Sequence, residues 1–213
     1  VRYWLHNGML TMGSEKMSKS LGNIVTIHDL LERHDGEVLR YALLSGQYRQ
    51  SLVWEDRLIR QAKASLDTLY QALRDTPDAN NDTSSAYRDA PIEAFPVAVL
   101  DALCDDLNTP EALAALHAIA GAIHRANDIE EAKRLRAQLL AGGWLLGLLD
   151  KPVAMYFQGE TEIDPDEIEK LIAQRNEARR NRDFAQADRI RDDLAARGIE
   201  LEDTRDGTRW KSA

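Results

Sequence analysis

The sequence contains a single cysteine, Cys104, and no apolar run close to the roughly 20 residues that a membrane-spanning helix requires. One thiol excludes an internal disulfide and a zinc site built from several thiolates, so we expect a reducing, cytoplasmic setting and no membrane partner. Cys104 itself is expected to be buried as a small hydrophobic residue. The formal net charge of −9 over 213 residues speaks against indiscriminate binding to nucleic acid, but it still permits a local basic face.

The segment 13-GSEKMSKSLGN-23 combines small, flexible and hydroxyl-bearing residues with two lysines, Lys16 and Lys19. A glycine-bounded loop of this kind offers backbone N–H groups, hydroxyls and two ammonium groups, which suit the binding of a polyphosphate. A lysine carries a compact charge that can follow phosphate oxygens as they shift during a reaction. For an arbitrary pair of lysines at this spacing, a solvated surface loop is the more frequent role.

The amino-terminal third is expected to combine a short β element with helices. Apolar–polar alternation predicts a strand or hairpin over residues 3–12, with its turn at residues 7–8. Thr26 and Asp29 have the spacing of a capping box, so a helix should begin there. Apolar residues at steps of three and four predict a long helix over residues 55–73.

The middle of the chain has the pattern of an antiparallel helix bundle over residues 86–150. The polar, turn-rich segment 75–85 is the expected linker before it. One helix of the bundle should begin with Thr109 as its cap and a proline in the first turn. Another, over residues 129–140, should end near the glycine pair at residues 142–143.

The carboxyl-terminal residues 160–213 predict a small α+β module of two helices and a hairpin. Asp164, followed by proline, should start the first helix. Asp183 should start the second, which ends at Gly198, a residue suited to the left-handed conformation after a helix. An Asp-Gly pair within residues 199–210 predicts the hairpin. The expected fold class is therefore mainly α, with one small α+β module.

Residues 16–20 spell KMSKS, the signature of class I aminoacyl-tRNA synthetases. More specifically, three stretches resemble the cysteinyl-tRNA synthetases of the bacterial type: 4-WLHNGMLTMGSEKMSKSLGN-23, 105-DDLNTPEAL-113 and 183-DFAQADRIRDDLAARGIELEDTRDGTRW-210. The resemblance covers essentially the whole chain in the same order. It implies three parts: residues 1–75 as the end of the catalytic domain with a stem-contact fold, residues 86–150 as a tRNA-binding bundle, and residues 160–213 as an anticodon-recognition module.

The resemblance also implies roles for the residues of the lysine segment. Lys19 contacts the phosphates of ATP, which is used with Mg²⁺, and Lys16 supports the mobile loop. Both are the catalytic candidates, while Met17, Ser18 and Ser20 complete the ATP-binding loop. The family's second nucleotide signature, a His-Ile-Gly-His element, occurs nowhere in the sequence. The family's zinc ligands also lie upstream of the loop, so we expect no metal site here, and we expect most of the Rossmann domain to be missing from a piece cut out of a longer protein.

Anticodon bases are unstacked, and proteins read them by stacking and by hydrogen bonds to the base edges. Steps of three and four put Arg175, Arg179 and Arg182 on one helix face. Asp203 is a candidate acceptor for the amino group of a cytosine or guanine. The candidate tRNA-binding residues are Arg175, Arg179, Arg182, Asp203, Arg205, Arg209 and Trp210. The competing interpretation is that the arginines pair with the neighbouring acidic residues and that Trp210 packs inside the hairpin.

The leading hypothesis is the carboxyl-terminal part of a cysteine–tRNA ligase. Its parent activates cysteine with ATP and transfers it from cysteinyl-adenylate to tRNA(Cys). By itself this chain is expected to bind tRNA or ATP weakly, not to catalyse, and to be monomeric. One alternative is the related ligase that joins cysteine to an amino-sugar in mycothiol synthesis, which by family pattern lacks the anticodon module. Another is a non-catalytic RNA-binding module.

Overall fold

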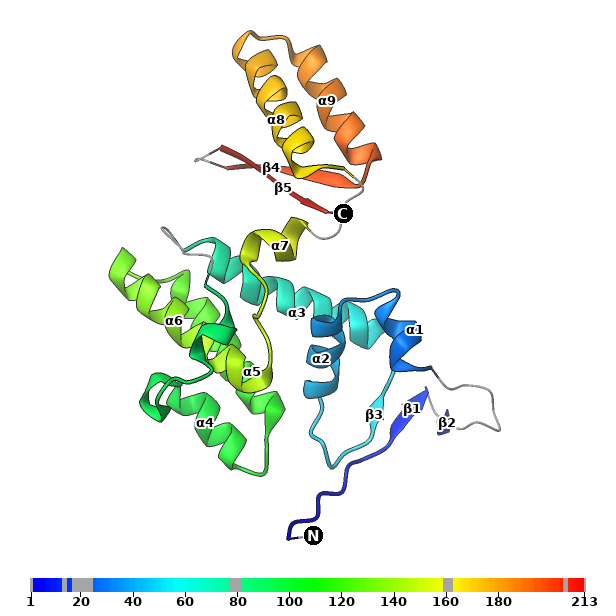
Figure 1. Cartoon of the computed structure of the whole chain (residues 1–213), viewed down its shortest axis with the longest axis vertical. Coiled ribbons are helices and arrows are strands. Elements are labelled where there is room, and N and C mark those ends of the chain that lie inside the picture. The colour runs from blue at the N-terminus through cyan, green and yellow to red at the C-terminus, as the bar shows by residue number, and fades with distance from the viewer. Residues whose placement is uncertain are drawn as a thin grey trace. The chain divides into compact units, whose positions relative to one another are not determined.

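The computed structural model describes residues 2–12, 15–16, 25–76, 82–158, 163–204 and 207–212. The chain divides into two compact units, Val1–Pro152 and Val153–Ala213. The predicted fold class, mainly helical with a small α+β module at the carboxyl-terminal end, is confirmed (Figure 1). Within these described ranges, no helix is both long enough and apolar enough to cross a bilayer.

Three short strands belong to the first unit: β1 (Leu10–Met12), β2 (Glu15–Lys16) and β3 (Leu52–Val53). β1 is the central strand, antiparallel to β2 and parallel to β3. The predicted hairpin with its turn at residues 7–8 is wrong, because β1 starts after this pair. Instead, the Gly8 N–H donates to the Tyr48 carbonyl oxygen at 2.7 Å. A Cβ atom at Gly8 would lie 1.9 Å from the carbonyl oxygen of Gln50, so the glycine permits this close backbone approach.

Three helices accompany these strands: α1 (Ile27–Leu31), α2 (Gly36–Leu44) and α3 (Asp56–Arg74). The predicted capping box starts α1, since the Asp29 N–H donates to the Thr26 hydroxyl and the Thr26 N–H donates to the Asp29 carboxylate, both at 3.2 Å. Asp35 caps α2 by accepting from the Glu37 N–H at 2.8 Å. The apolar stripe of α3 packs against α2 and α5, which confirms the predicted long helix.

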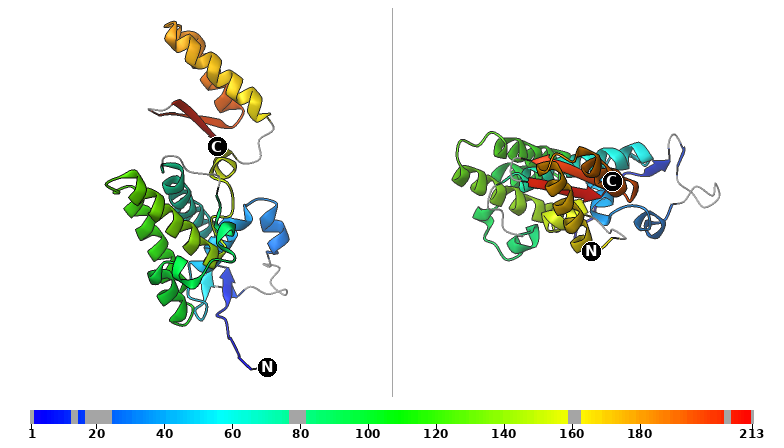
Figure 2. Two further views of the ribbon diagram at one scale, coloured as in Figure 1. Left: turned by 60° about the vertical axis from the view of Figure 1, so that its left-hand side comes forward. Right: turned by 90° about the horizontal axis from the view of Figure 1, so that it is seen from above.

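Further along the described part of the first unit lie two 3-10 turns, η2 (Ser84–Tyr87) and η3 (Ile92–Ala94), and three helices, α4 (Val97–Cys104), α5 (Thr109–Ile123) and α6 (Ile129–Leu146). α5 and α6 lie side by side in every view (Figures 1 and 2). Thr109 is not the cap of α5. The Asn108 side chain accepts from the Glu111 N–H at 3.3 Å, whereas the Thr109 hydroxyl donates to the Leu44 carbonyl oxygen at 2.7 Å.

α6 is longer than predicted, because it continues through the glycine pair to Leu146 and ends at Gly147, with φ of 65°. A Cβ atom at Gly142 would lie 2.6 Å from Cδ2 of Leu116 on α5. A Cβ atom at Gly143 would lie 2.9 Å from the carbonyl oxygen of Leu148. These glycines therefore allow close packing inside the unit and do not end the helix.

The expected burial of Cys104 is also wrong, since the residue is exposed at the last position of α4. α4 buries Val99 and Ala102. At 3.6 residues per turn, position 104 points away from the side on which these two residues lie.

The second unit contains α7 (Val153–Gln158), α8 (Pro165–Arg180), α9 (Phe184–Ala196), β4 (Ile199–Thr204) and β5 (Gly207–Ser212). Asp183 caps α9 by accepting from a backbone N–H at 3.0 Å, and Gly198 has φ of 77° after the helix, as predicted. β4 and β5 pair antiparallel, which confirms the predicted hairpin. Its turn, residues 205–206, lies outside the described residues.

The core of the second unit lies between the two helices and the hairpin. Its buried members are Ile163, Ile168, Ile172, Leu194, Ile199 and Trp210. Trp210 is only 5% exposed, and its indole N–H donates to a carboxylate oxygen of Glu169 at 3.1 Å. The interpretation of Trp210 as core packing is therefore the one that the structure supports.

Candidate nucleic-acid interface

The lysine segment is attached to the sheet of the first unit. β1 and β2 pair with Thr11 opposite Lys16, which ties the backbone at the start of the segment to a strand. The rest of the proposed ATP loop, Met17, Ser18, Lys19 and Ser20, lies outside the described residues, and so does the side chain of Lys16. The proposed phosphate contacts of these residues therefore stay a prediction.

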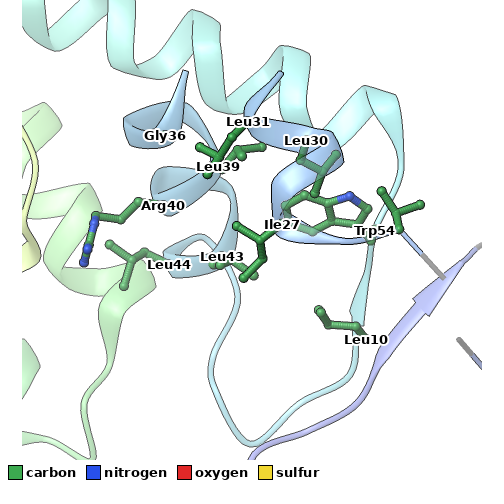
Figure 3. Close-up of a pocket in the computed structure, with 11 residues that line it drawn as sticks. Leu10, Ile27, Leu30, Leu31, Gly36, Leu39, Arg40, Leu43, Leu44 and Trp54 are labelled. Atoms are coloured by element: carbon green, nitrogen blue, oxygen red, sulfur yellow. The ribbon is translucent and has the colours of Figure 1, made fainter. Parts of the chain in front are cut away.

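An apolar cavity of about 420 Å³ lies where the described chain resumes after the lysine segment. Figure 3 shows its lining, in which the ring of Trp54 faces aliphatic side chains of α1. The lining residues are Leu10, Val25, Ile27, Leu30, Leu31, Gly36, Leu39, Arg40, Leu43, Leu44 and Trp54. With Arg40 as the charged member of this set, the cavity suits an apolar group and not a polyphosphate.

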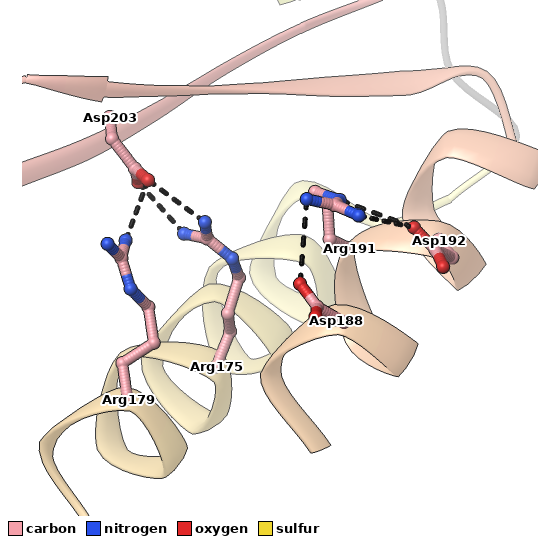
Figure 4. Close-up of polar contacts among 6 residues, drawn as sticks. All are labelled: Arg175, Arg179, Asp188, Arg191, Asp192 and Asp203. Atoms are coloured by element: carbon pink, nitrogen blue, oxygen red, sulfur yellow. Dashed lines mark hydrogen bonds and ion pairs between the residues drawn. The ribbon is translucent and has the colours of Figure 1, made fainter. Parts of the chain in front are cut away.

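Two arginines of α8 point toward one carboxylate of β4 (Figure 4). Arg175 donates through both terminal nitrogens to the two oxygens of Asp203, at 2.8 and 2.9 Å. Arg179 donates to Oδ2 at 2.6 Å, and the Thr208 hydroxyl donates to Oδ1 at 2.9 Å. Four donors thus fill the acceptor positions of the carboxylate. A cytosine or guanine amino group would have to displace one of them to reach Asp203.

The two arginines differ in exposure, and this separates their roles. The Arg175 side chain is only 9% exposed, whereas that of Arg179 is 46% exposed. Hydrogen bonds from Arg175 hold the pKa of the Asp203 carboxyl well below its usual value of 3.8, and the same pairing raises the pKa of Arg175. Arg175 and Asp203 therefore act as a structural pair, while the Arg179 side chain stays about half exposed.

Replacing Asp203 with alanine is expected to destabilise the second unit by about 2 kcal/mol. Breaking a fully buried ion pair destabilises a protein by more than this. The Asp203 side chain is 44% exposed, however, so water replaces part of the lost interaction. Because the folded pKa lies below the unfolded one, the stabilisation is present above about pH 4 and is lost as the pH falls through the folded pKa. Urea titrations at pH 5 and pH 2.5, in which hydrogen exchange of the second unit's amides reports unfolding, measure this loss.

Asp203→Asn provides the matched control for the pH dependence. It keeps the shape of the side chain but removes the titrating carboxyl, so its stability should fall less between the two pH values than that of the unchanged chain. Equal falls in the two proteins would contradict the assignment of acid sensitivity to Asp203.

The expected single helix face of three arginines holds only for Arg175 and Arg179. Arg182 lies beyond the last residue of α8 and has φ of 61°. The physical reason is the cap of the next helix, because Asp183 begins α9 and the chain must reverse direction just before it.

The remaining candidates are in different surroundings. Arg209 is half-buried on β5, Trp210 is buried in the core, and Arg205 lies outside the described residues. Arg191 pairs with Asp188 at 3.5 Å and with Asp192 at 3.1 Å (Figure 4), as expected if the arginines of α9 neutralise neighbouring acids. The exposed arginines among the candidates, Arg179 and Arg182, therefore lie at the carboxyl-terminal end of α8 and just after it.

Sequence reasoning missed Phe184, the first residue of α9, which is 61% exposed. An exposed aromatic ring two positions from Arg182 offers a platform on which an unpaired base can stack. Helical periodicity could not have found this exposure, because Phe184 lies three positions before the buried Ala187 and ten before the buried Leu194, a spacing typical of the core-facing stripe.

Among the described residues, no group of three His, Cys, Asp or Glu side chains lies close enough together to hold a metal ion.

Three family models match the chain in sequence order. A model described as "tRNA synthetases class I (C) catalytic domain" matches residues 1–64. A "DALR domain" model matches residues 98–150, and a model described as "Cysteinyl-tRNA ligase anticodon binding domain" matches residues 164–210. The third match spans α8, α9 and most of the hairpin, the elements that carry Arg179 and Phe184.

Curated relatives match all or nearly all of the chain. A cysteine–tRNA ligase of Xanthomonas campestris pv. campestris is 52% identical over 213 residues, which are 100% of this chain and 44% of the relative. A cysteine–tRNA ligase of Paramagnetospirillum magneticum is 49% identical over 99% of this chain and 45% of the relative. One from Parvibaculum lavamentivorans is 46% identical over 100% of this chain and 44% of the relative. The chain thus spans less than half the length of these relatives.

Proposed function

We infer that this chain, which matches the carboxyl-terminal region of cysteine–tRNA ligases over its whole length, serves as the tRNA-holding part of an ATP-dependent ligase of that kind. The observation that carries this inference is the order of the three family matches, together with about half of all residues being identical in the relatives. The proposed partners are tRNA(Cys), cysteine and ATP. We place the reaction in the cytoplasm and propose a monomer.

The proposed reaction has two steps. Cysteine attacks the α-phosphate of ATP, giving cysteinyl-adenylate and pyrophosphate, and the 3′ end of tRNA(Cys) then displaces AMP from the adenylate. Lys19 would hold the phosphates as negative charge develops on the leaving pyrophosphate, and Lys16 would support the loop. Mg²⁺ enters with ATP as part of the substrate. Zinc is assigned to the longer ligase and to none of the residues described here.

The domain assignment is also a proposal. Residues 1–75 would carry the ATP loop and the stem contact, residues 86–150 would bind tRNA, and residues 160–213 would read the anticodon. The match of residues 164–210 to an anticodon-binding model speaks against the ligase that joins cysteine to an amino-sugar, which by family pattern lacks this module.

Binding of the anticodon stem-loop of tRNA(Cys) tests the assignment of the second unit. Replacing Phe184 with alanine is expected to weaken binding about tenfold, because stacking of one base on an aromatic ring contributes roughly 1–3 kcal/mol. Fluorescence anisotropy at fixed salt concentration measures the dissociation constant, since phosphate contacts make it depend on salt.

Met155→Ala is the control, because Met155 is 63% exposed on α7 and lies outside the residues matched to the anticodon-binding model. Its affinity should equal that of the unchanged chain. If Phe184→Ala also binds normally, or if an unrelated stem-loop binds equally well, then this unit does not read the anticodon.

A further inference from the structure

The corner between α4 and α5, residues 105–109, is hydrogen-bonded to the loop that joins α2 to β3. The Tyr48 hydroxyl donates to Oδ1 of Asp106 at 2.8 Å. Arg49 donates to both oxygens of the same carboxylate, through Nε at 2.7 Å and through Nη2 at 2.8 Å. The Thr109 hydroxyl adds a bond to the Leu44 carbonyl oxygen at 2.7 Å. This corner therefore binds the loop at its start, through Leu44, and near its middle, through Tyr48 and Arg49.

The corner adopts a backbone conformation that few side chains accept. Asp106 has φ of 52° and Leu107 has φ of 53°, both in the left-handed region. Two successive residues other than glycine in this region store strain, which the surroundings must offset. Hydrogen bonds from Arg49 and Tyr48 lower the pKa of Asp106 to about 2, so the carboxylate stays charged and keeps these contacts at neutral pH.

The same loop is in turn hydrogen-bonded through its backbone to the strand that leads into the lysine segment. The Gly8 N–H donates to the Tyr48 carbonyl oxygen at 2.7 Å. Beyond the loop, the Leu52 N–H donates to the Met9 carbonyl oxygen at 3.0 Å, and the Trp54 N–H donates to the Thr11 carbonyl oxygen at 2.8 Å. Thr11 pairs with Lys16 across β1 and β2. An unbroken series of contacts thus leads from Asp106 to the backbone of Lys16.

We propose that Asp106 is a positioning residue for amino-acid activation: by clamping Tyr48 and Arg49, it fixes the strand from which the lysine segment extends. The proposal rests on the function proposed above, in which that segment binds ATP. It gives the Asp106 carboxylate a task that neither the helix bundle nor tRNA binding explains. Displacing a reacting group by about 1 Å from a distance can slow a reaction as much as hundredfold, so a loosened clamp should be visible in the rate.

Hydrogen exchange in the 213-residue chain tests the clamp independently of catalysis. Asp106→Gly removes the carboxylate but accepts the left-handed backbone without strain. Amides in residues 8–12 and 50–54 should exchange about fivefold faster, which is the change expected from the loss of an exposed but bidentate ion pair. Arg49→Ala should act alike, and the double variant should add little, because both changes break the same contact.

Glu130→Ala is the matched control, since it also removes one exposed carboxylate, which pairs with Lys133 at 3.5 Å on α6. It should leave exchange in residues 8–12 and 50–54 unchanged. Unchanged exchange in Asp106→Gly itself would overturn the proposal.

The ligase that contains this chain provides the second test. Asp106→Gly should lower kcat for cysteine-dependent exchange of pyrophosphate with ATP about tenfold, with KM for cysteine and the affinity for tRNA(Cys) unchanged. Asp106→Asn should lower the rate less than Asp106→Gly, because asparagine tolerates the left-handed backbone and its oxygen still accepts from Tyr48 and Arg49, although the charge and the second oxygen are lost. No exchange in the unchanged ligase would refute the proposed function. Exchange that Asp106→Gly leaves unaltered, or a loss matched by a fall in tRNA affinity, would refute the positioning role alone.

Discussion

Replacing Trp210 with alanine is expected to unfold most of the second unit at room temperature. Trp210 is 5% exposed and lies with five aliphatic residues in the core formed by α8, α9 and the hairpin. Truncating a buried tryptophan costs about 4 kcal/mol, from lost apolar burial and from the cavity left behind. A single core in a unit this small supplies roughly 3–5 kcal/mol in total, so the variant should have little stability left.

Hydrogen exchange of the amides in α8 and α9 measures this effect without interference from the first unit. Trp210→Phe should cost only about 1.5 kcal/mol, because it keeps an aromatic ring but loses volume and the bond to Glu169. Arg209→Ala, one position earlier on the same strand, should change stability by no more than about 0.5 kcal/mol. Native-like protection of α8 and α9 in Trp210→Ala would show that the core does not depend on this residue.

Helix starts were predictable from the sequence because a cap is a local interaction. Thr26, Asp35 and Asp183 each accept a hydrogen bond from a backbone N–H two or three residues later, so the pattern contains all the information required. Gly198 was predictable for the same reason, since a left-handed residue after a helix depends on the backbone of its own turn.

The predictions of secondary structure were wrong where contacts between residues distant in the sequence determine the conformation. The Asn-Gly pair at residues 7–8 has the local signature of a hairpin, but β1 pairs with β3, whose residues are about 40 positions away. The glycines at 142–143 have the signature of a helix end, yet they stay helical because α5 and the chain after α6 pack closely against them. In both cases the glycine was needed for close approach, which no local pattern distinguishes from a turn.

For the candidate site, too, the sequence predicted what local spacing determines and not what contacts between distant residues determine. Arginine spacing correctly placed Arg175 and Arg179 on one helix face, and both reach Asp203. That Arg175 is buried and Arg179 exposed depends on the hairpin crossing beside α8, because Asp203 comes from β4, 28 positions along the chain from Arg175. For the same reason, the sequence suggested Asp203 as a base contact when its oxygens already serve four internal donors.

Replacing Lys19 with alanine in the longer ligase that we propose for this chain is expected to slow cysteine activation about hundredfold or more. Removing one donor aimed at charge that develops in a transition state typically lowers kcat by about 10²–10³. The loss should fall on kcat for pyrophosphate exchange, because the developing charge is larger in the transition state than in bound ATP. Affinity for tRNA(Cys) should stay within about twofold, since the proposed anticodon contacts lie in the second unit.

Pyrophosphate exchange and stem-loop binding, measured on the same preparations, separate these two effects. Lys133→Ala, which also replaces a lysine with alanine but on α6, should leave both measurements unchanged. The 213-residue chain alone should give no cysteine-dependent exchange, because we propose only phosphate contacts for the lysine segment and assign no amino-acid site to the described residues. If Lys19→Ala weakened tRNA binding as strongly as exchange, the lysine segment would be an RNA contact. The division between an ATP-binding loop and an RNA-reading module would then be wrong.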